Sequence, residues 1–199
     1  MKHFFSIILM AISVATFAQI KTFNADVNTT SIAWTGKKIG LENKGLIKLK
    51  SGYFGVKNGA IEFGKFVIDM NSMTCTNISD ADKCSRLINH LKNDDFFSVE
   101  KFATAELHIT KVEPISNAAK GQPNYTFHGN LKIKGKTNPI QFPALVEVNG
   151  NTLKGNAKFS IDRTKWGVNF NSGTVFSILA EKAISDNIDF EVAVNANLK

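Results

Sequence analysis

The stretch SDADKCSRLINHLKNDDFFSVEKFATAELHIT, residues 79–110, combines the one clear helical pattern of the chain with the start of a strand. Ser79 and Asp82 fit the N-cap and the third residue of a capping box. The apolar residues that follow recur with the spacing of one helix face: Ala81, Cys84, Leu87, Ile88 and Leu91. The pattern predicts a helix that is capped by Ser79 and packs one apolar face against the rest of the protein.

An aromatic corner joins this helix to the strand. Phe96 and Phe97 follow two aspartates, and the pattern then changes to strict alternation at Leu107 and Ile109. The corner has two interpretations: its rings seal one end of a cavity, or they only anchor the helix. In either case the helix would act as a cap or a side wall on a sheet.

Almost all of the remaining chain shows the two-residue periodicity of β-strands. The run 125–134 alternates without a fault, and turn signals separate such runs, among them Asn58-Gly59 and the region of Gly52. Residues 175–183 fit either a second short helix or a bulged loop. About eight strands of antiparallel type and one helix predict an all-β fold, either a closed barrel or a sandwich.

The N-terminal residues have the pattern of a secretory signal peptide. Lys2 precedes the apolar run 4–14, and the small-x-small sequence 16–18 offers a cleavage site. A transmembrane anchor is the alternative, but the run is shorter than the roughly 20 residues that span a bilayer. We therefore predict a leader at 1–18 and one mature domain at 19–199, periplasmic or secreted, with no stable membrane insertion after cleavage.

Charge and its distribution limit the classes of partner. Without the leader the formal charge is +6, and the lysines are spread along strands in alternation with apolar residues. This pattern is typical of a solvated outer sheet face, whereas a nucleic-acid site would gather basic residues together with exposed aromatic ones. We therefore predict no nucleic-acid partner.

The chain has two cysteines, Cys75 and Cys84. In an exported protein an even number favours a disulfide, which would hold the start of the helix to the preceding segment. Closing a loop of about ten residues would stabilise the fold by roughly 2–3 kcal/mol. Two free buried thiols are the alternative, with Cys84 contributing to the apolar face of the helix.

The sequence contains no motif typical of an enzyme or a metal centre. It has no G-x-S-x-G elbow and no H-E-x-x-H, and only three histidines follow the leader. His108 and His128 would lie near each other on the outer side of a hairpin and could bind a metal weakly. Two exposed histidines without a third ligand are the simpler interpretation. We predict neither catalysis nor a metal or another resident cofactor.

Phenylalanine is unusually frequent, with thirteen residues after the leader. Because its ring has no polar atom that needs a partner, this composition suits a thick core or the lining of an apolar cavity. The segment KFSIDRTKWGVNF, residues 158–170, places Arg163 and Trp166 just where an apolar strand ends. These side chains either hold the polar head of an amphiphile or only stabilise a turn.

Five segments, in this order, resemble the YceI-like polyisoprenoid-binding family: IAWTGKK, GKFVIDMNSM, HLKNDDFFSVEKFATAEL, GNLKIKGKTNPI and AKFSIDRTKWGVNF. The similarity extends from Thr22 to Ala196. It implies a lipocalin-like antiparallel barrel that encloses an apolar tunnel for an isoprenoid or another long-chain amphiphile. It implies neither catalysis nor a metal.

We therefore expect an eight-stranded lipocalin-like barrel with one capping helix, which sequesters or carries one long apolar ligand as a monomer or a homodimer. The ligand would be a polyisoprenoid, an isoprenoid quinone or a fatty-acid derivative, bound non-covalently. The predicted lining and mouth residues are Trp34, Phe66, Phe96, Phe127 and Phe159, then Arg163, Trp166 and Phe170. The alternative is a structural or interaction protein whose barrel is filled by its own phenylalanines and binds no lipid.

Overall fold

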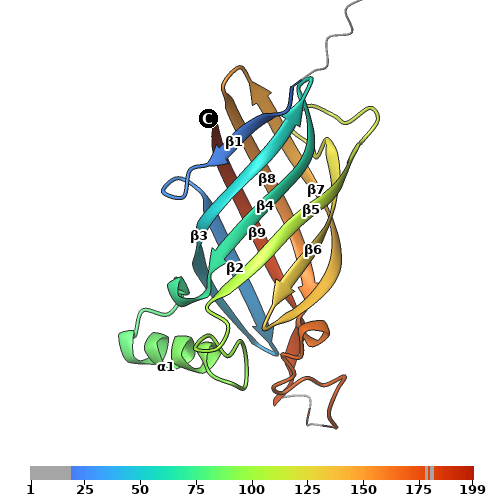
Figure 1. Cartoon of the computed structure of the whole chain (residues 1–199). Coiled ribbons are helices and arrows are strands. Elements are labelled where there is room, and N and C mark those ends of the chain that lie inside the picture. Colours follow the sequence, from blue (N-terminus) through green and yellow to red (C-terminus); the bar gives the residue numbers. More distant parts are fainter. Residues whose placement is uncertain (1–18, 178, 180–181) are drawn as a thin grey trace, which may run out of the picture.

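Antiparallel pairing closes the β-sheet of this protein into a barrel (Figure 1). The computed structural model describes residues 19–177, 179 and 182–199, so the predicted leader at 1–18 lies outside the described residues. Between the described strands lie the helix α1 (Ala81–Lys92) and the short 3-10 helices η1 (Met70–Ser72) and η2 (Arg163–Trp166). The strands in this part of the chain are β1 (Lys21–Ala25), β2 (Ser31–Lys38), β3 (Leu41–Lys57), β4 (Ala60–Asp69), β5 (Thr104–Pro114), β6 (Tyr125–Ile133), β7 (Lys136–Asn149), β8 (Thr152–Asp162) and β9 (Ile184–Leu198).

The barrel has eight strand positions because β1 and β2 share one of them. Phe23 of β1 pairs with Phe54 of β3 and with Leu198 of β9, and Ile32 of β2 pairs with other residues of the same two strands. From β9 the sheet continues through β8, β7, β6, β5 and β4, and the pairing of β4 with β3 closes the circle. The predicted eight-stranded antiparallel barrel is therefore confirmed.

Alternation along the strands separates an apolar interior from a polar exterior. In β6, Phe127, Leu131 and Ile133 are buried while Asn130 and Lys132 are exposed, as the sequence predicts. One wall of the interior is aromatic. A belt of rings crosses β6 to β9 with successive centroids 5.7, 4.4 and 5.6 Å apart: Phe127, Phe142, Phe159 and Phe190.

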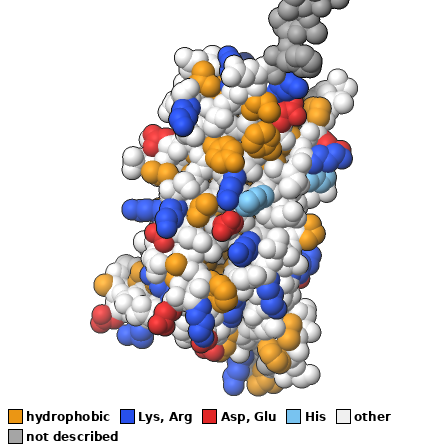
Figure 2. All heavy atoms as spheres, viewed as in Figure 1, with side chains coloured by type: hydrophobic (Ala, Val, Ile, Leu, Met, Phe, Trp, Pro, Cys, Tyr) orange, Lys and Arg blue, Asp and Glu red, His pale blue; other side chains and the backbone are white. Residues whose placement is uncertain are grey.

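The outer face carries charges of both signs. Figure 2 shows Lys and Arg side chains scattered among Asp and Glu on the face in view. Across neighbouring strands these charges form pairs, such as Lys158 of β8 with Glu191 of β9 at 3.0 Å and Lys37 of β2 with Asp189 of β9 at 2.8 Å. Exposed pairs of this kind contribute little to stability, so their main effect is on solubility.

At the barrel end near α1, the segment 72–77 continues the sheet where β4 stops. The amide of Thr74 donates to the carbonyl of Leu46 at 2.9 Å, and the amide of Thr76 donates to the carbonyl of Lys44 at 2.8 Å. The segment therefore satisfies backbone groups of β3 that β4 leaves without a partner. It also leads the chain from the barrel wall into α1, which lies at the lower end of the barrel in Figure 1.

Two local predictions were wrong. Gly52 lies inside β3 and not in a turn, because β3 continues past it through a local bulge. The N-cap of α1 is Asp80 and not Ser79: the Asp80 carboxylate accepts a hydrogen bond from the amide of Lys83 at 3.0 Å. Since Lys83 is the third residue after this cap, the helix has no capping box.

Two further segments were not resolved by sequence patterns. β1 has only five residues, too few for a clear alternation, and we did not predict it. The expected short helix or bulged loop at 175–183 falls partly on residues 178 and 180–181, which lie outside the described residues. Of the residues before them, Val175 lies in a turn and Phe176 in a bend.

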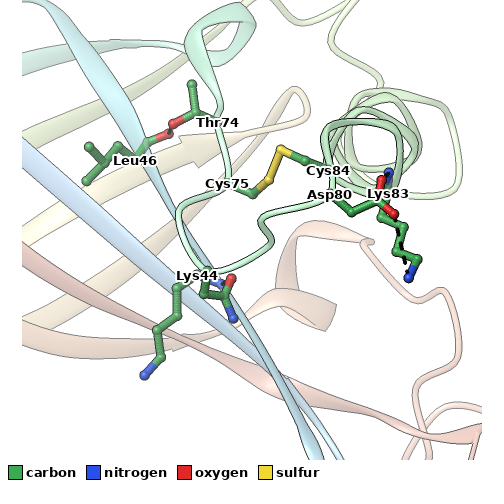
Figure 3. The surroundings of a disulfide bond; sticks show 8 residues. Lys44, Leu46, Thr74, Cys75, Asp80, Lys83 and Cys84 are labelled. Carbon is green, nitrogen blue, oxygen red and sulfur yellow. Dashed lines mark hydrogen bonds and ion pairs between the residues drawn. A yellow bond between two sulfur atoms is a disulfide. The ribbon is translucent and has the colours of Figure 1, made fainter.

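A disulfide joins α1 to the segment that borders the barrel (Figure 3). Cys75 and Cys84 are bonded, with their Cα atoms 6.0 Å apart, which confirms the predicted pair. Cys75 lies between Thr74 and Thr76, whose amides donate to β3, and Cys84 lies in the first turn of α1. The bond therefore fixes α1 to the barrel wall.

The double variant Cys75→Ala/Cys84→Ala is expected to lose roughly 2–3 kcal/mol of unfolding free energy, because its unfolded chain regains the freedom that the closed loop removes. Urea unfolding without reductant measures this difference. As a control, dithiothreitol should lower the stability of the wild type to that of the variant and leave the variant unchanged. Equal stability of the oxidised wild type and the variant would contradict this role of the bond.

Candidate ligand-binding cavity

The barrel encloses an apolar cavity of about 290 Å³. Its wall consists of inward-facing residues of every strand from β2 to β9. Along the barrel it extends from Phe54 and Val194 at one end to Leu87 and Leu91 of α1 at the other. An elongated apolar space of this kind suits a hydrocarbon chain, because each methylene that enters it leaves water.

The aromatic corner covers part of the α1 end of this cavity. Both Phe96 and Phe97 line it, together with Leu87 and Leu91. The corner also anchors the helix, because the amide of Phe97 donates to the carbonyl of Leu91 at 3.1 Å. The two interpretations of the corner therefore hold together in part: its rings cover one side of the cavity end and its backbone is tied to α1.

The structure brings six of the eight predicted ligand-site residues to one cavity. Trp166 and Phe170 do not line it. The six residues come from β2, β4, β6, β8, the aromatic corner and η2: Trp34, Phe66, Phe127, Phe159, Phe96 and Arg163.

Trp166 and Phe170 lie elsewhere than the predicted cavity mouth. Trp166 is 1% exposed, and its indole Nε1 donates to the carbonyl of Leu131 at 2.9 Å, which makes it a core residue. Phe170 packs behind the aromatic corner, with its ring centroid 5.3 Å from that of Phe96. Gly167, which has a left-handed backbone conformation, ends η2 and changes the direction of the chain between Trp166 and Phe170. The sequence pattern did not indicate this change of direction.

Arg163 is a buried cation at the η2 end of the cavity, 2% exposed. Its guanidinium donates to the carbonyls of Val168 at 2.7 Å, Ser185 at 3.0 Å and Ile184 at 3.1 Å. Asp186 completes the site as an ion-pair partner, with Oδ1 3.4 Å from Nη2. Arg163 therefore ties η2 to the start of β9.

Electrostatics leave Arg163 charged in this position. Burial lowers the pKa of the guanidinium, and the carboxylates of Asp186 and Asp162 partly oppose this effect. Because the ordinary pKa of arginine lies far above neutrality, the group keeps its proton. Three N–H donors of Arg163 bind carbonyls of the protein, so Arg163 does stabilise the local structure, which is one of its two predicted roles. The other role, contact with the polar head of an amphiphile, stays a prediction.

Two cavity residues had no clear signal in the sequence. Met73 lies beside η1, and its placement depends on how the 72–77 segment pairs with β3. Ala105 lines the cavity just before the alternation that the sequence shows at Leu107 and Ile109. Alternation along the strands did predict that Met70 shares a face with Phe66 and that Ala157 faces inward, and both line the cavity. The helical periodicity of the sequence did predict an apolar face of α1, and this face carries the lining residue Leu87.

Gly45 allows Trp34 and the 72–77 segment to pack closely at the α1 end. A Cβ atom at this position would overlap the carbonyl oxygen of Thr74 and approach Cζ2 of Trp34 to 2.5 Å. We expect Gly45→Ala to lower the free energy of unfolding by about 1–3 kcal/mol, because the clash is with backbone that is held in the sheet.

Gly36→Ala is the matched control for this substitution, since no atom lies within 4 Å of a Cβ built at Gly36. Thermal unfolding of the two variants gives the comparison. Gly45→Ala should melt at a clearly lower temperature than Gly36→Ala, and equal melting temperatures would refute the close packing at Gly45.

The described residues contain neither a cluster of metal-ligating side chains nor a helix suited to span a membrane. The outer histidines have separate carboxylate partners, His128 with Glu113 at 2.6 Å and His108 with Glu106 at 3.4 Å, and no group of three or more metal-ligating side chains occurs in the part that the structure describes. None of the helices among the same residues combines the length and the apolar character needed to cross a membrane.

A closed antiparallel barrel of eight positions around an apolar cavity is the lipocalin-like architecture. Residues 23–196 match the YceI-like domain family, and the chain belongs to this family. The resemblance noted in the sequence is therefore confirmed over nearly the whole described chain.

Two curated proteins show similarity to parts of the chain. It is 33% identical over 98 residues to a UPF0312 protein of Yersinia enterocolitica, which covers 49% of this chain and 44% of that protein. It is 27% identical over 133 residues to a lysine–tRNA ligase of Buchnera aphidicola, which covers 67% of this chain and 26% of that protein. The chain thus spans less than half the length of each of these relatives.

Solved structures share the fold along most of the chain. BcnA of Burkholderia cenocepacia superposes with a TM-score of 0.66 at 17% identity, over 87% of this chain and 99% of that one. A polyisoprenoid-binding domain of Saccharophagus degradans superposes with a TM-score of 0.61 at 12% identity, over 91% of this chain and all of that one. At such identities the likeness establishes the fold.

Proposed function

We propose that this protein binds one long-chain apolar molecule inside the barrel, in an extended conformation along the cavity. The observation that carries the proposal is the continuous apolar lining between Phe54 and Phe97, with few polar side chains along it. Such an interior discriminates poorly between head groups and strongly between chain lengths. It is also at odds with the alternative of a barrel filled by its own phenylalanines.

The ligand class that we propose is an isoprenoid chain, with isoprenoid quinones and fatty-acid derivatives as related candidates. Membership of the YceI-like family and the polyisoprenoid-binding name of one structural neighbour support this class. Burial of each methylene contributes about 0.8 kcal/mol, so affinity should rise roughly fourfold per methylene until the cavity is full.

The place of action that we propose is the periplasm or the medium. The support is the sequence pattern of the first eighteen residues, with a positive start, an apolar run and a small-x-small site. N-terminal sequencing of the protein recovered from its natural host tests this proposal. Protein that begins at Gln19 in an exported fraction would support it, and cytoplasmic protein with an intact leader would overturn it.

Solvent extraction followed by mass spectrometry tests the ligand proposal directly. Protein purified from its natural host is expected to yield about one long-chain lipid per chain, and delipidated protein should bind fluorescent probes with an affinity that rises with chain length. Recovery of no lipid, together with no binding of such probes, would overturn the proposal.

A further inference from the structure

Large apolar side chains from two segments are exposed at the α1 end of the barrel. In the hairpin between β2 and β3, Ile39 is 66% exposed and Leu41 is 52% exposed. In the segment after η2, Val175 is 45% exposed and Phe176 is 51% exposed. Figure 2 shows hydrophobic side chains at the lower tip of the molecule, next to Lys and Arg side chains.

The two pairs of apolar residues lie on neighbouring segments of one edge. Lys38, next to Ile39, pairs with Ile184 of β9. On its other side Ile184 forms a bridge with Ser172, which accepts a hydrogen bond from the amide of Phe176 at 3.1 Å. The hairpin and the segment after η2 are therefore joined through a single residue of β9.

The cavity opens at this same edge. Lys37 and Lys38 of β2 line the cavity although both side chains are exposed, and so do the half-buried Ile184 and Ser185 at the start of β9. The register between β2 and β9 shifts between Gly36 and Lys38, so the ladder of the two strands is irregular there. A chain that entered here would pass directly beside the exposed apolar side chains.

Exposed lysines without an ion-pair partner in the described part of the chain lie at the α1 end of the barrel. Three exposed lysines, Lys38, Lys136 and Lys165, have no ion-pair partner among the described residues. Four carboxylates at this end are paired with a lysine or an arginine: Glu42 with Lys44, Asp94 with Lys101, Asp186 with Arg163 and Asp189 with Lys37. Asp82 and Glu100 have no ion-pair partner among the described residues. An exposed apolar cluster with unpaired lysines around it is the pattern of a surface that inserts into an anionic lipid interface.

We propose that this end of the barrel docks on an anionic membrane surface, with Ile39, Leu41, Val175 and Phe176 in the interface and the cavity opening facing the lipid. The inference rests on the proposed function, because it describes how a long apolar chain would enter or leave the cavity. Docking in this orientation lets the chain move between membrane and barrel without exposing its methylenes to water, which removes the main barrier to exchange.

Sedimentation with vesicles tests the docking surface. The probes are vesicles of phosphatidylcholine alone and of phosphatidylcholine and phosphatidylglycerol in roughly equal parts. We expect the wild-type protein to bind the anionic vesicles, and binding to weaken with added salt. The variant Ile39→Ser/Phe176→Ser should bind the anionic vesicles at least about tenfold more weakly than the wild type, because two apolar side chains no longer enter the interface.

Ile115→Ser is the matched control, since Ile115 is also exposed but follows β5 at the opposite end of the barrel (Figure 1). It should bind vesicles like the wild type. Lys38→Glu/Lys165→Glu provides a second variant, which should lose the preference for anionic vesicles while its fold, checked by circular dichroism, is unchanged.

Three outcomes would overturn the docking proposal. The wild type could bind neither kind of vesicle, or Ile115→Ser could weaken vesicle binding as much as Ile39→Ser/Phe176→Ser does. The third is a wild-type dimer that Ile39→Ser/Phe176→Ser converts to a monomer, because a second copy of the chain would then cover this face. Binding of a long-chain probe in vesicle-free solution is measured for every variant. If the wild type binds the probe but no vesicle, docking alone fails; if it binds vesicles but no probe, the proposed function fails.

Discussion

Ala157→Phe is expected to weaken the binding of a long-chain probe about a hundredfold or more while the barrel stays folded. Ala157 lies on β8, lines the cavity, and pairs with Val192 of β9 and Ala144 of β7. A phenyl ring at this position would take the space of about four methylenes, and each of these contributes about 0.8 kcal/mol to binding. Titration with probes of increasing chain length measures the effect.

Ala193→Phe is the control for this prediction. Ala193 is on the adjacent strand β9, paired with Ser31 and Asn156, and its side chain belongs to the outer face. It should leave probe binding unchanged. Wild-type affinity in Ala157→Phe would contradict the position of the ligand. If Ala157→Phe loses about 1–3 kcal/mol of unfolding free energy, its core is overpacked, which would favour the alternative of a self-filled barrel.

Arg163→Met should destabilise the protein by about 3–5 kcal/mol, the largest loss that we expect from a single substitution. The guanidinium is the hydrogen-bond donor for the carbonyls of Val168, Ile184 and Ser185, and methionine would leave the buried carbonyl of Val168 and the part-buried carbonyls of the other two without this donor. It would also leave the carboxylate of Asp186 without its cation. Chemical denaturation of both proteins gives the difference.

Two companion variants separate the contributions of Arg163. Arg163→Lys keeps the charge but not the planar fork, so it should recover only part of the stability. Asp186→Asn in the Arg163→Met background should also recover part, because no unpaired carboxylate remains. If Arg163→Met is as stable as the wild type, or if the second substitution lowers stability further, the role assigned to this cation is wrong.

The sequence predicts the barrel because strand alternation is a local property. In β6 each side chain is assigned to the correct side by its neighbours alone, and Phe127 reaches the cavity as predicted. The disulfide follows from the number of cysteines together with the predicted export, and the aromatic corner follows from the change of period between the helix and the alternation at Leu107 and Ile109. These features depend on residues close together in the chain.

The remaining features depend on residues that are far apart in the chain. Gly52 resembles a turn residue, but β3 continues through it because β1 and β4 both pair with this strand. The sequence predicts Trp166 as a residue of the cavity mouth, but its indole donates a hydrogen bond to the carbonyl of Leu131 on a strand that is distant in the sequence. The irregular pairing of β2 with β9 beside the cavity opening is a register shift between Gly36 and Lys38, and no pattern within either strand encodes it.

The strand position that β1 and β2 share also bears on how fast the protein folds. Phe23 pairs with Leu198, and the amide of Lys199 donates to the carbonyl of Thr22 at 3.0 Å, so the barrel closes only when its first and last strands meet. Contacts of such high sequence separation carry a large loop-closure entropy, and domains dominated by them fold in milliseconds to seconds. Before that step β9 offers an unpaired edge to other molecules, so the chain is most prone to aggregate late in folding, after most of its strands have formed.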